Sequence, residues 1–164
     1  MMHDNDGEDD GYDISTLRGR DYPTIRQFTV FLENRVGRLM ELLRKFDGTG
    51  VRIVAINIHD STECSLVRLV LTDPERGREI LERAGLAMIE SDLVAVELPN
   101  DPQPLLRICT ALLSAEINLV QAYPLIGQQN GHHAVALMVD NCEIAADTLQ
   151  RKGFRVIEEA DLSG

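Results

Sequence analysis

The sequence contains two copies of one pattern. Three successive segments recur in the same order about 66 residues later, and the offset grows by only two residues along the chain. The matching segments are Asn34–Leu39 and Asn100–Leu105, then Val67–Asp73 and Ala134–Asp140, and then Leu81–Gly85 and Leu149–Gly153, at offsets of 66, 67 and 68 residues. Because order and spacing persist over three segments, the chain is a tandem repeat of one structural unit.

Each copy predicts the same series of elements. A strand-like run is followed by a helical pattern, two further strands joined by a polar turn, a second helix and a short last strand. The predicted strands are 27–33, 51–58, 66–71 and 87–90 in the first copy, and 93–98, 117–126, 134–139 and 154–158 in the second. The second helices begin at Asp73-Pro74 and at Asp140-Asn141, where the polar side chains are suited to cap them, and end at Gly85 and Gly153.

This β-α-β-β-α-β order, present twice, predicts an α+β protein made of two ferredoxin-like units. Each unit has an antiparallel sheet with both helices on one face. We place the first unit at 25–91 and the second at 92–160. A unit of this size has a marginal core alone, so we expect the two to pair within the chain. Only Ser91 and Asp92 separate the last strand of one from the first strand of the next, which favours rigid docking.

The composition excludes several classes of function. Hydrophobic residues make up 44% and charged residues 26%, as in soluble globular proteins. A net charge of -11 and an aromatic fraction of 4% argue against a nucleic-acid partner, which needs basic residues and stacking rings. Apolar runs are too short to cross a membrane, and the N-terminus does not resemble a signal peptide. The three scattered cysteines favour a reducing, cytoplasmic location.

The charge is unevenly distributed. Residues 1–24 hold seven acids and two bases, residues 25–91 hold ten of each, and residues 92–164 hold ten acids and four bases. The first stretch has no sustained apolar pattern, so we interpret 1–24 as an acidic, disordered N-terminal tail. The two repeated units therefore differ in net charge, zero against -6.

We find no pattern typical of an enzyme. Nucleophile, phosphate-binding and zinc-protease motifs are missing from the sequence. The histidines are better interpreted as loop residues than as metal ligands, and the cysteines as buried small hydrophobes. We therefore predict a non-catalytic protein with no metal site and no cofactor. The histidines are His3, His59, His132 and His133, and the cysteines are Cys64, Cys109 and Cys142.

Two segments carry a resemblance to a known family. Residues Phe31–Leu39 resemble the strand-loop-helix signature of ACT domains, with Asn34 and Gly37 in place, and Ala115–Leu119 is similar to the segment entering the second strand of that domain. The chain thus resembles a tandem ACT-domain protein over about residues 25–160, and is similar to bacterial stand-alone proteins related to acetolactate synthase regulatory subunits. The resemblance implies an amino-acid-binding regulatory module that acts on a metabolic enzyme.

The candidate ligand-binding residues are those of the first loop. A glycine where a strand turns into a helix lets a ligand approach the backbone, and unpaired helix N–H groups suit a carboxylate. Gly37 could equally be a purely steric turn residue, and Asn34 could bind the ligand or only cap the helix. The loop residues that we assign to ligand binding are Asn34, Arg35, Val36, Gly37 and Arg38.

The resemblance also implies that the ligand lies between two domains, so the second unit should complete the site. It keeps Asn118 at the entrance of its second strand, and Tyr123 in that strand could line the site or simply pack. Arg52 replaces the corresponding asparagine in the first unit, and Asn100–Gln103 lacks the glycine. We therefore expect one composite site per chain and a poor or altered second one. Leu32 stands where ACT domains sometimes have a polar histidine, and this departure implies a ligand with a more apolar side chain.

Two functional classes remain open. One is a sensor that binds an amino acid and signals to an enzyme subunit. The other is a ligand-free structural or oligomerisation module. In both, exposed sheet edges and helix faces favour a homodimer.

Overall fold

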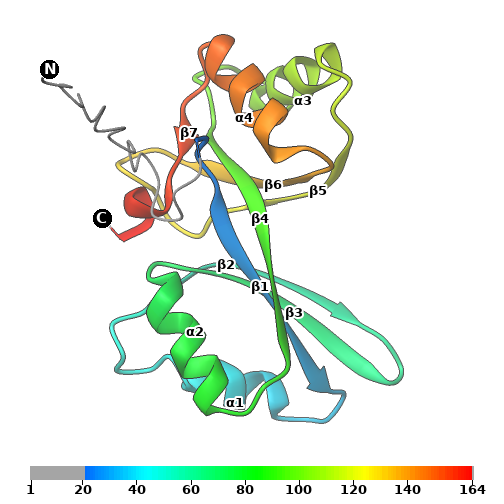
Figure 1. The fold of residues 1–164 in the computed structure, drawn as a ribbon, viewed down its shortest axis with the longest axis vertical. Helices are drawn as coiled ribbons and strands as arrows, with labels where there is room; N and C mark the ends of the chain where they lie inside the picture. The colour runs from blue at the N-terminus through cyan, green and yellow to red at the C-terminus, as the bar shows by residue number, and fades with distance from the viewer. Residues whose placement is uncertain (1–20, 164) are drawn as a thin grey trace, which may run out of the picture.

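The computed structural model describes residues 21–163, in which the predicted element order is present twice (Figure 1). The first unit contains β1 (Ile25–Glu33), α1 (Arg38–Arg44), β2 (Ile53–Asp60), β3 (Cys64–Leu71), α2 (Pro74–Arg83) and β4 (Met88–Glu97). The second contains α3 (Pro104–Ser114), β5 (Leu119–Pro124), β6 (Ala134–Val139), α4 (Cys142–Arg151), β7 (Val156–Ile157) and the 3₁₀ helix η1 (Glu159–Ser163). The α+β class and the two ferredoxin-like units are confirmed.

Strand β4 belongs to both units. We predicted two strands separated by Ser91 and Asp92, but these residues lie inside one continuous strand. Its first half, up to Leu93, pairs with β1, and its second half pairs with β6 on one side and β7 on the other. The prediction that Ser91 and Asp92 connect two strands was wrong, because these polar residues continue the strand and form no turn. Both residues remain within the β1–β4 ladder, opposite Gln27 and Arg26.

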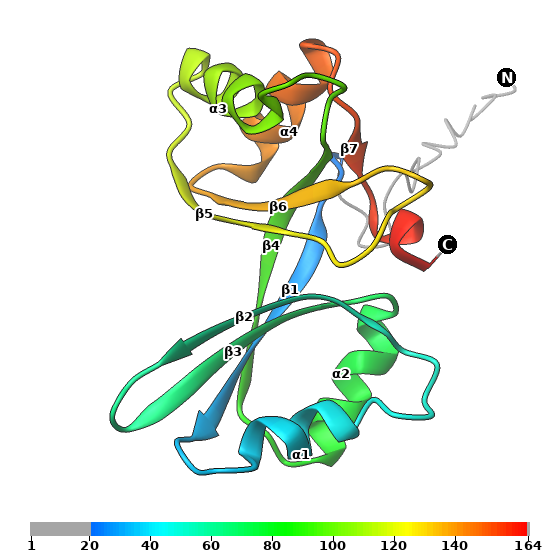
Figure 2. The ribbon, with the colours of Figure 1, turned by 180° about the vertical axis from the view of Figure 1, so that it is seen from behind.

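The strands form one sheet in the order β2-β3-β1-β4-β6-β5, with β7 paired to β4. Helices α1 and α2 cover the outer face of the first half, and α3 and α4 cover the outer face of the second (Figures 1 and 2). The inner faces of the two halves turn toward each other. The molecule thus has four layers, with helices outside and sheet inside, and each sheet face has a cover.

The alternation of side chains along β4 shows how the layers are filled. Leu93 and Ala95 belong to the core between the two sheet halves, whereas Val94 and Val96 belong to the core beneath α3 and α4. A strand segment buried on both faces reads as a continuous apolar run, as Leu93–Val96 does in the sequence. The first unit has its own core, centred on Phe28, beneath α1 and α2.

The two edge strands of the sheet meet at one end. The backbone N–H of Ile126, just after β5, donates to the carbonyl of Val54 in β2 over 2.6 Å. Further along, the side chain of Gln121 donates to the Asn57 amide oxygen at 3.5 Å. The sheet therefore curls back on itself, and the edges are partly protected from pairing with other chains.

The helix ends follow the predicted chemistry in two of the four helices. Asp73 and Asn141 accept hydrogen bonds from backbone N–H groups three residues later, at 3.1 and 3.0 Å, and so cap α2 and α4. The last strand is shorter than predicted, because the N–H of Phe154 still bonds to the carbonyl of Leu149 in the final turn of α4. Strand β7 consequently begins only at Val156.

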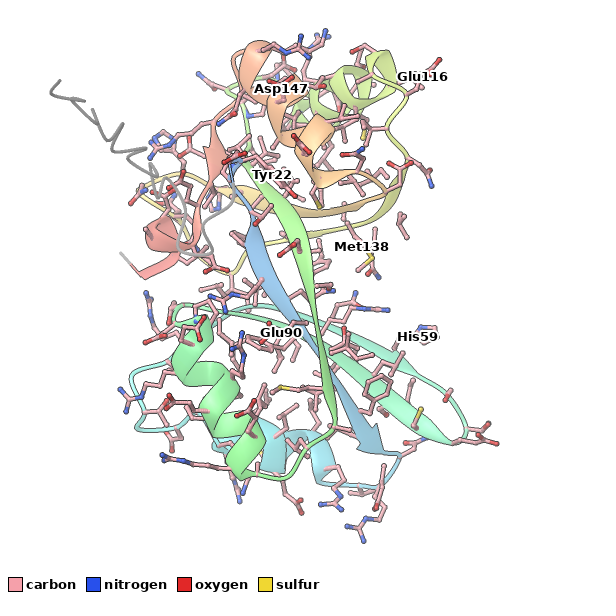
Figure 3. The ribbon with its side chains drawn as sticks, viewed as in Figure 1. Tyr22, His59, Glu90, Glu116, Met138 and Asp147 are labelled. Carbon is pink, nitrogen blue, oxygen red and sulfur yellow. The ribbon has the colours of Figure 1, made fainter. Side chains whose placement is uncertain are left out.

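Most of the predicted acidic tail, residues 1–20, lies outside the described residues. Residues 21–24, the end of the predicted tail, lie within the described part of the chain. Pro23 and Thr24 are buried at the start of β1, and Tyr22 packs against the core of the second unit (Figure 3). The chain therefore contacts the second unit before it enters the first sheet.

A buried ion pair joins the two units. The Arg26 guanidinium in β1 donates to both carboxylate oxygens of Glu159 in η1, at 2.8 and 2.9 Å, and the Arg26 backbone N–H donates to the same carboxylate. Both side chains are 2% exposed. Arg26 also donates to Glu75 at the start of α2, a carboxylate that is 65% exposed. Hydrogen bonds to Glu159, and then to Glu75, raise the pKa of Arg26 above its ordinary value.

We predict that Glu159→Gln lowers the free energy of unfolding by about 3 kcal/mol, because it leaves a guanidinium buried beside a neutral amide. Glu75→Gln is the matched control, since it removes a carboxylate from the same guanidinium at an exposed position, and should cost less than about 1 kcal/mol. Urea unfolding of the two variants measures both values. Equal losses would contradict the assignment of the Arg26–Glu159 pair as the contact that locks the units.

Candidate ligand-binding site

The predicted loop of the first unit connects β1 to α1. Gly37 immediately precedes the helix with φ 87°, a left-handed conformation that strains any residue with a Cβ. A Cβ built there would meet no other atom within 4 Å. The glycine is therefore required by backbone conformation, and the space beside it is open.

Asn34 does not cap α1, so that alternative was wrong. Its side-chain amide donates to the carbonyl of Ser61 over 2.8 Å, in the turn between β2 and β3. No side chain caps this helix, whose N-cap residue is Gly37. The bond from Asn34 instead ties the loop to the β2–β3 hairpin, which fixes one wall of the space between them.

Two arginines of the loop are held by one carboxylate. Glu33 pairs with Arg35 at 3.4 Å and with Arg38 at 3.3 Å, and Arg38 also pairs with Glu41 at 2.9 Å. Hydrogen bonds to Glu41 and then Glu33 raise the pKa of Arg38. The contacts hold both guanidinium groups at the loop, and each guanidinium has further N–H groups to offer.

These residues border a small hollow of about 220 Å³. The polar part of its lining consists of Glu33, Asn34, Arg35, Arg38, Asp60 and Ser65. The remaining wall is mainly apolar and includes Leu32, Ile58 and Val67. Val36 is fully exposed at the tip of the loop. Of the five predicted loop residues, the structure thus places three around one hollow, with Gly37 at the start of the adjoining helix.

Asn118 lies elsewhere in the molecule. It is exposed in the turn between α3 and β5, where its backbone N–H donates to the Asp140 carboxylate at 3.2 Å. Figure 3 shows Glu116, in the same turn, at the opposite end of the molecule from the β1–α1 loop. Residues Asn34–Arg38 and Asn118 are therefore not brought together within one chain.

Tyr123 packs between the two sheet halves and does not line the hollow. It is 7% exposed, and its hydroxyl donates to the side-chain oxygen of Gln27 in β1. Burial raises the pKa of this phenol well above the ordinary 10.0, against a smaller opposite effect of Arg68. Of the two roles considered from the sequence, the structure supports the packing role.

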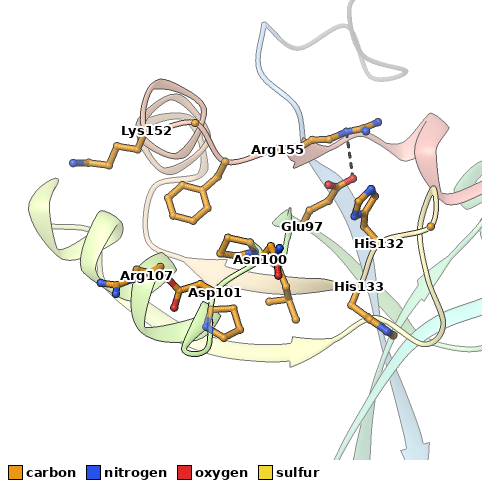
Figure 4. A pocket seen from close by; sticks show the side chains of 14 residues that line it. Glu97, Asn100, Asp101, Arg107, His132, His133, Lys152 and Arg155 are labelled. Carbon is orange, nitrogen blue, oxygen red and sulfur yellow. Dashed lines mark hydrogen bonds and ion pairs between the residues drawn. The ribbon is translucent and has the colours of Figure 1, made fainter.

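The corresponding region of the second unit holds a larger hollow, of about 880 Å³ (Figure 4). The loop between β4 and α3, which we expected to form a poor site, makes one wall of it. Arg52, the other half of that expected site, is not among its lining residues. The turn from α4 into β7 and the β5–β6 hairpin make the other walls. Their charged and ring-bearing residues are Lys152, Phe154, Arg155, His132 and His133.

Sequence reasoning missed this hollow because its residues come from three separate segments, 97–107, 131–133 and 152–155. Two ion pairs line it. Arg107 contacts Asp101 at 3.0 Å, and Arg155 contacts Glu97 at 3.4 Å. The N–H of Gln103 and then Arg107 lower the pKa of Asp101, so this carboxylate is charged and held in the loop. The one feature of the sequence that could have indicated this hollow is the scarcity of basic residues in the second unit, because three of its four basic residues line the hollow.

The comparisons with known proteins agree with this architecture. The profile of the family described as ACT domain pair matches residues 23–164. The chain belongs to the ACT domain pair family. A comparison with curated protein sequences gives no match.

Solved structures share the fold of these ACT units. Protein BT0572 from Bacteroides thetaiotaomicron is similar with a TM-score of 0.78 and 22% identity, over 88% of this chain and 99% of that one. The ligand-free regulatory subunit of aspartate kinase from Thermus thermophilus is similar with a TM-score of 0.53 and 12% identity, over 80% and 93% of the two chains. The same subunit from Thermus flavus gives 0.50 and 14%, over 80% and 93%.

Within residues 21–163, no three histidine, cysteine or acidic side chains are close enough to hold a metal ion. None of the helices there is long and apolar enough to span a bilayer. The prediction of buried cysteines was wrong. Cys109 is exposed in the middle of α3, and Cys64 and Cys142 are half-buried as the first residues of β3 and α4.

We predict that Tyr123→Phe lowers the free energy of unfolding by about 1 to 2 kcal/mol at pH 7, because Gln27 loses a buried donor. Above about pH 10 the unfolded chain releases the Tyr123 proton while the native state keeps it, so the wild type loses stability as pH rises. The variant lacks this titration. Urea unfolding from pH 7 to 11 should therefore show the difference between the two proteins shrinking, and a constant difference would contradict the buried, protonated phenol.

Proposed function

We propose that this protein is a non-catalytic regulator that binds a small amino acid between two ACT units and signals to a metabolic enzyme in the cytoplasm. Membership of the ACT domain pair family supports a regulatory, ligand-binding role. The observation that carries the proposal is the hollow beside the β1–α1 loop, where a left-handed glycine adjoins two arginines.

The walls of this hollow suit a zwitterion. Arg35 and Arg38, both paired with the lining carboxylate of Glu33, have further N–H groups for an α-carboxylate, and Asp60, another lining residue, offers an anion for an α-ammonium group. Leu32 and Ile58 offer an apolar surface for a side chain. The volume of about 220 Å³ matches a small ligand. The arrangement therefore favours an amino acid with an apolar side chain.

The second half of the site comes from a second copy of the chain. Asn118 and the loop of the same chain are too far apart to share a ligand, so one chain alone does not assemble the composite site. In a two-fold symmetric dimer, the loop of each copy faces the Asn118 turn of the other, which gives two equivalent sites. This pairing places the first unit of each copy, which has no net charge, next to the second unit of the other copy, which has a charge of -6. The two acidic second units then do not face each other.

A ligand-free assembly module is the second candidate. It is favoured by α3, whose outer face exposes Leu105, Leu106 and Leu113, and by the loss of the glycine loop in the second unit. The two candidates differ in a thermal-shift screen with the standard amino acids at millimolar concentration. Ligand binding to the native state raises the melting temperature. The assembly module predicts no shift, and a melting temperature that depends on protein concentration.

We predict that Gly37→Val abolishes binding of the amino acid found in that screen. A β-branched residue is strained at this φ, although the site has room for its Cβ. Gly48→Val is the matched control, because Gly48 is also left-handed, with open space around it, and lies beyond the other end of α1. Calorimetry should show binding lost in Gly37→Val and kept in Gly48→Val. Equal effects would mean that backbone strain alone, and not the loop, is responsible.

We predict that Asn118→Ala also abolishes binding, and that the two variants complement each other. In a co-expressed mixture, heterodimers carry one site with both defects and one intact site. With random pairing, binding should recover to about a quarter of the wild-type stoichiometry. No recovery would refute the shared site, whereas wild-type binding by Asn118→Ala would remove Asn118 from it. If no amino acid binds the wild type, the sensor function itself fails.

A further inference from the structure

The hollow of the second unit shares no residue with the proposed amino-acid site, and its chemistry differs. Its lining includes three of the four basic residues found in residues 92–164, namely Arg107, Lys152 and Arg155. That half of the chain has ten acids and a net charge of -6. With Glu97 and Asp101 as the acids of the same lining, the three cations leave an excess of one positive charge at this concave surface, in an otherwise acidic unit.

The three cations are not equally engaged. Arg107 and Arg155 are each oriented by an acid of the wall, Asp101 and Glu97 respectively. Arg107 contacts Asp101 through Nε, and a guanidinium has four further N–H groups. For Lys152, which ends α4, no ion pair with an acidic side chain is found among the described residues. Figure 4 shows Lys152 and Arg107 on one side of the hollow, and Arg155 with Glu97 on the other.

Apolar groups make much of the remaining wall. Leu98, Pro99 and Pro104 lie at the start of the loop and of α3, and the half-buried ring of Phe154 faces them from the turn after α4. An inorganic anion would leave this apolar surface wet, whereas a ring on the ligand would cover it. The volume of about 880 Å³ falls within the range usual for sites of small organic molecules.

We propose that this hollow binds an organic anion that carries a ring. The acid group, a carboxylate or a phosphate, lies between Lys152 and Arg107, and the ring lies against Phe154 and the prolines of the β4–α3 loop. The site is built by the second unit alone, so it is filled independently of the amino-acid site. A chain with two diverged ACT units would thereby respond to two different chemical classes of ligand.

The test uses four probes on the full chain, measured by calorimetry at low ionic strength: phenyl phosphate, phenylacetate, inorganic phosphate and benzyl alcohol. We expect at least one ring-bearing anion to bind more tightly than both inorganic phosphate and the neutral alcohol. The comparison of phenyl phosphate with phenylacetate identifies the acid group. Half-molar sodium chloride should weaken the binding, because the cations are partly exposed. No binding of either ring-bearing anion at millimolar concentration would overturn the proposal.

A pair of neighbouring variants locates the site. Lys152→Gln should weaken binding of the better probe roughly threefold to tenfold. Arg151→Gln removes the same charge one residue earlier, where the side chain pairs with Asp147 and is 72% exposed outside the hollow, and should leave affinity unchanged. Phe154→Leu keeps an apolar side chain and should cost roughly threefold through the lost ring contact. Equal effects of Lys152→Gln and Arg151→Gln would show that the probe responds only to the general charge of the surface, and would refute the site.

Discussion

Strand β4 is the constraint on which the rest of the structure depends. Because one continuous strand pairs with β1 in its first half and with β6 and β7 in its second, the two ACT units share a hydrogen-bonded ladder. Leu93 and Ala95 then face the space between the sheet halves, and their neighbours Val94 and Val96 face the helices. The units cannot rotate about this strand without breaking backbone hydrogen bonds that have no water to replace them.

That rigidity decides which residues can share a site. The inner faces of both sheet halves are buried in the common core, in which Tyr123 donates a hydrogen bond to Gln27. The buried ion pair of Arg26 and Glu159 occupies a further part of the space between the units. The loops that carry polar residues are left at the outer ends of the molecule. The β1–α1 loop and the Asn118 turn are thereby held apart, and an interface between copies is the place where they can meet.

The two units have diverged from one pattern into different surfaces. In the first, a small hollow beside the β1–α1 loop is lined by Arg35 and Arg38 and by apolar side chains, and the left-handed Gly37 lies in the same loop. In the second, Gln103 stands where the first unit has Gly37, and Asp101 accepts hydrogen bonds from the Gln103 N–H and from Arg107, while Lys152 and Phe154 line the hollow from the turn after α4. The hollow of the second unit is the wider of the two, and its paired Asp101 repels an anion less than a free carboxylate would.

The sequence by itself determined the repeat, the order of elements and the caps at Asp73 and Asn141. These depend on local periodicity and on backbone conformation, which neighbouring residues control. Only the tertiary structure decided that Ser91 and Asp92 continue a strand, that Asn34 bonds to Ser61, that Tyr123 is buried and that Lys152 lies with Arg107 at one hollow. Each of these depends on which distant segments the shared sheet brings together, and no pattern within a single segment contains that information.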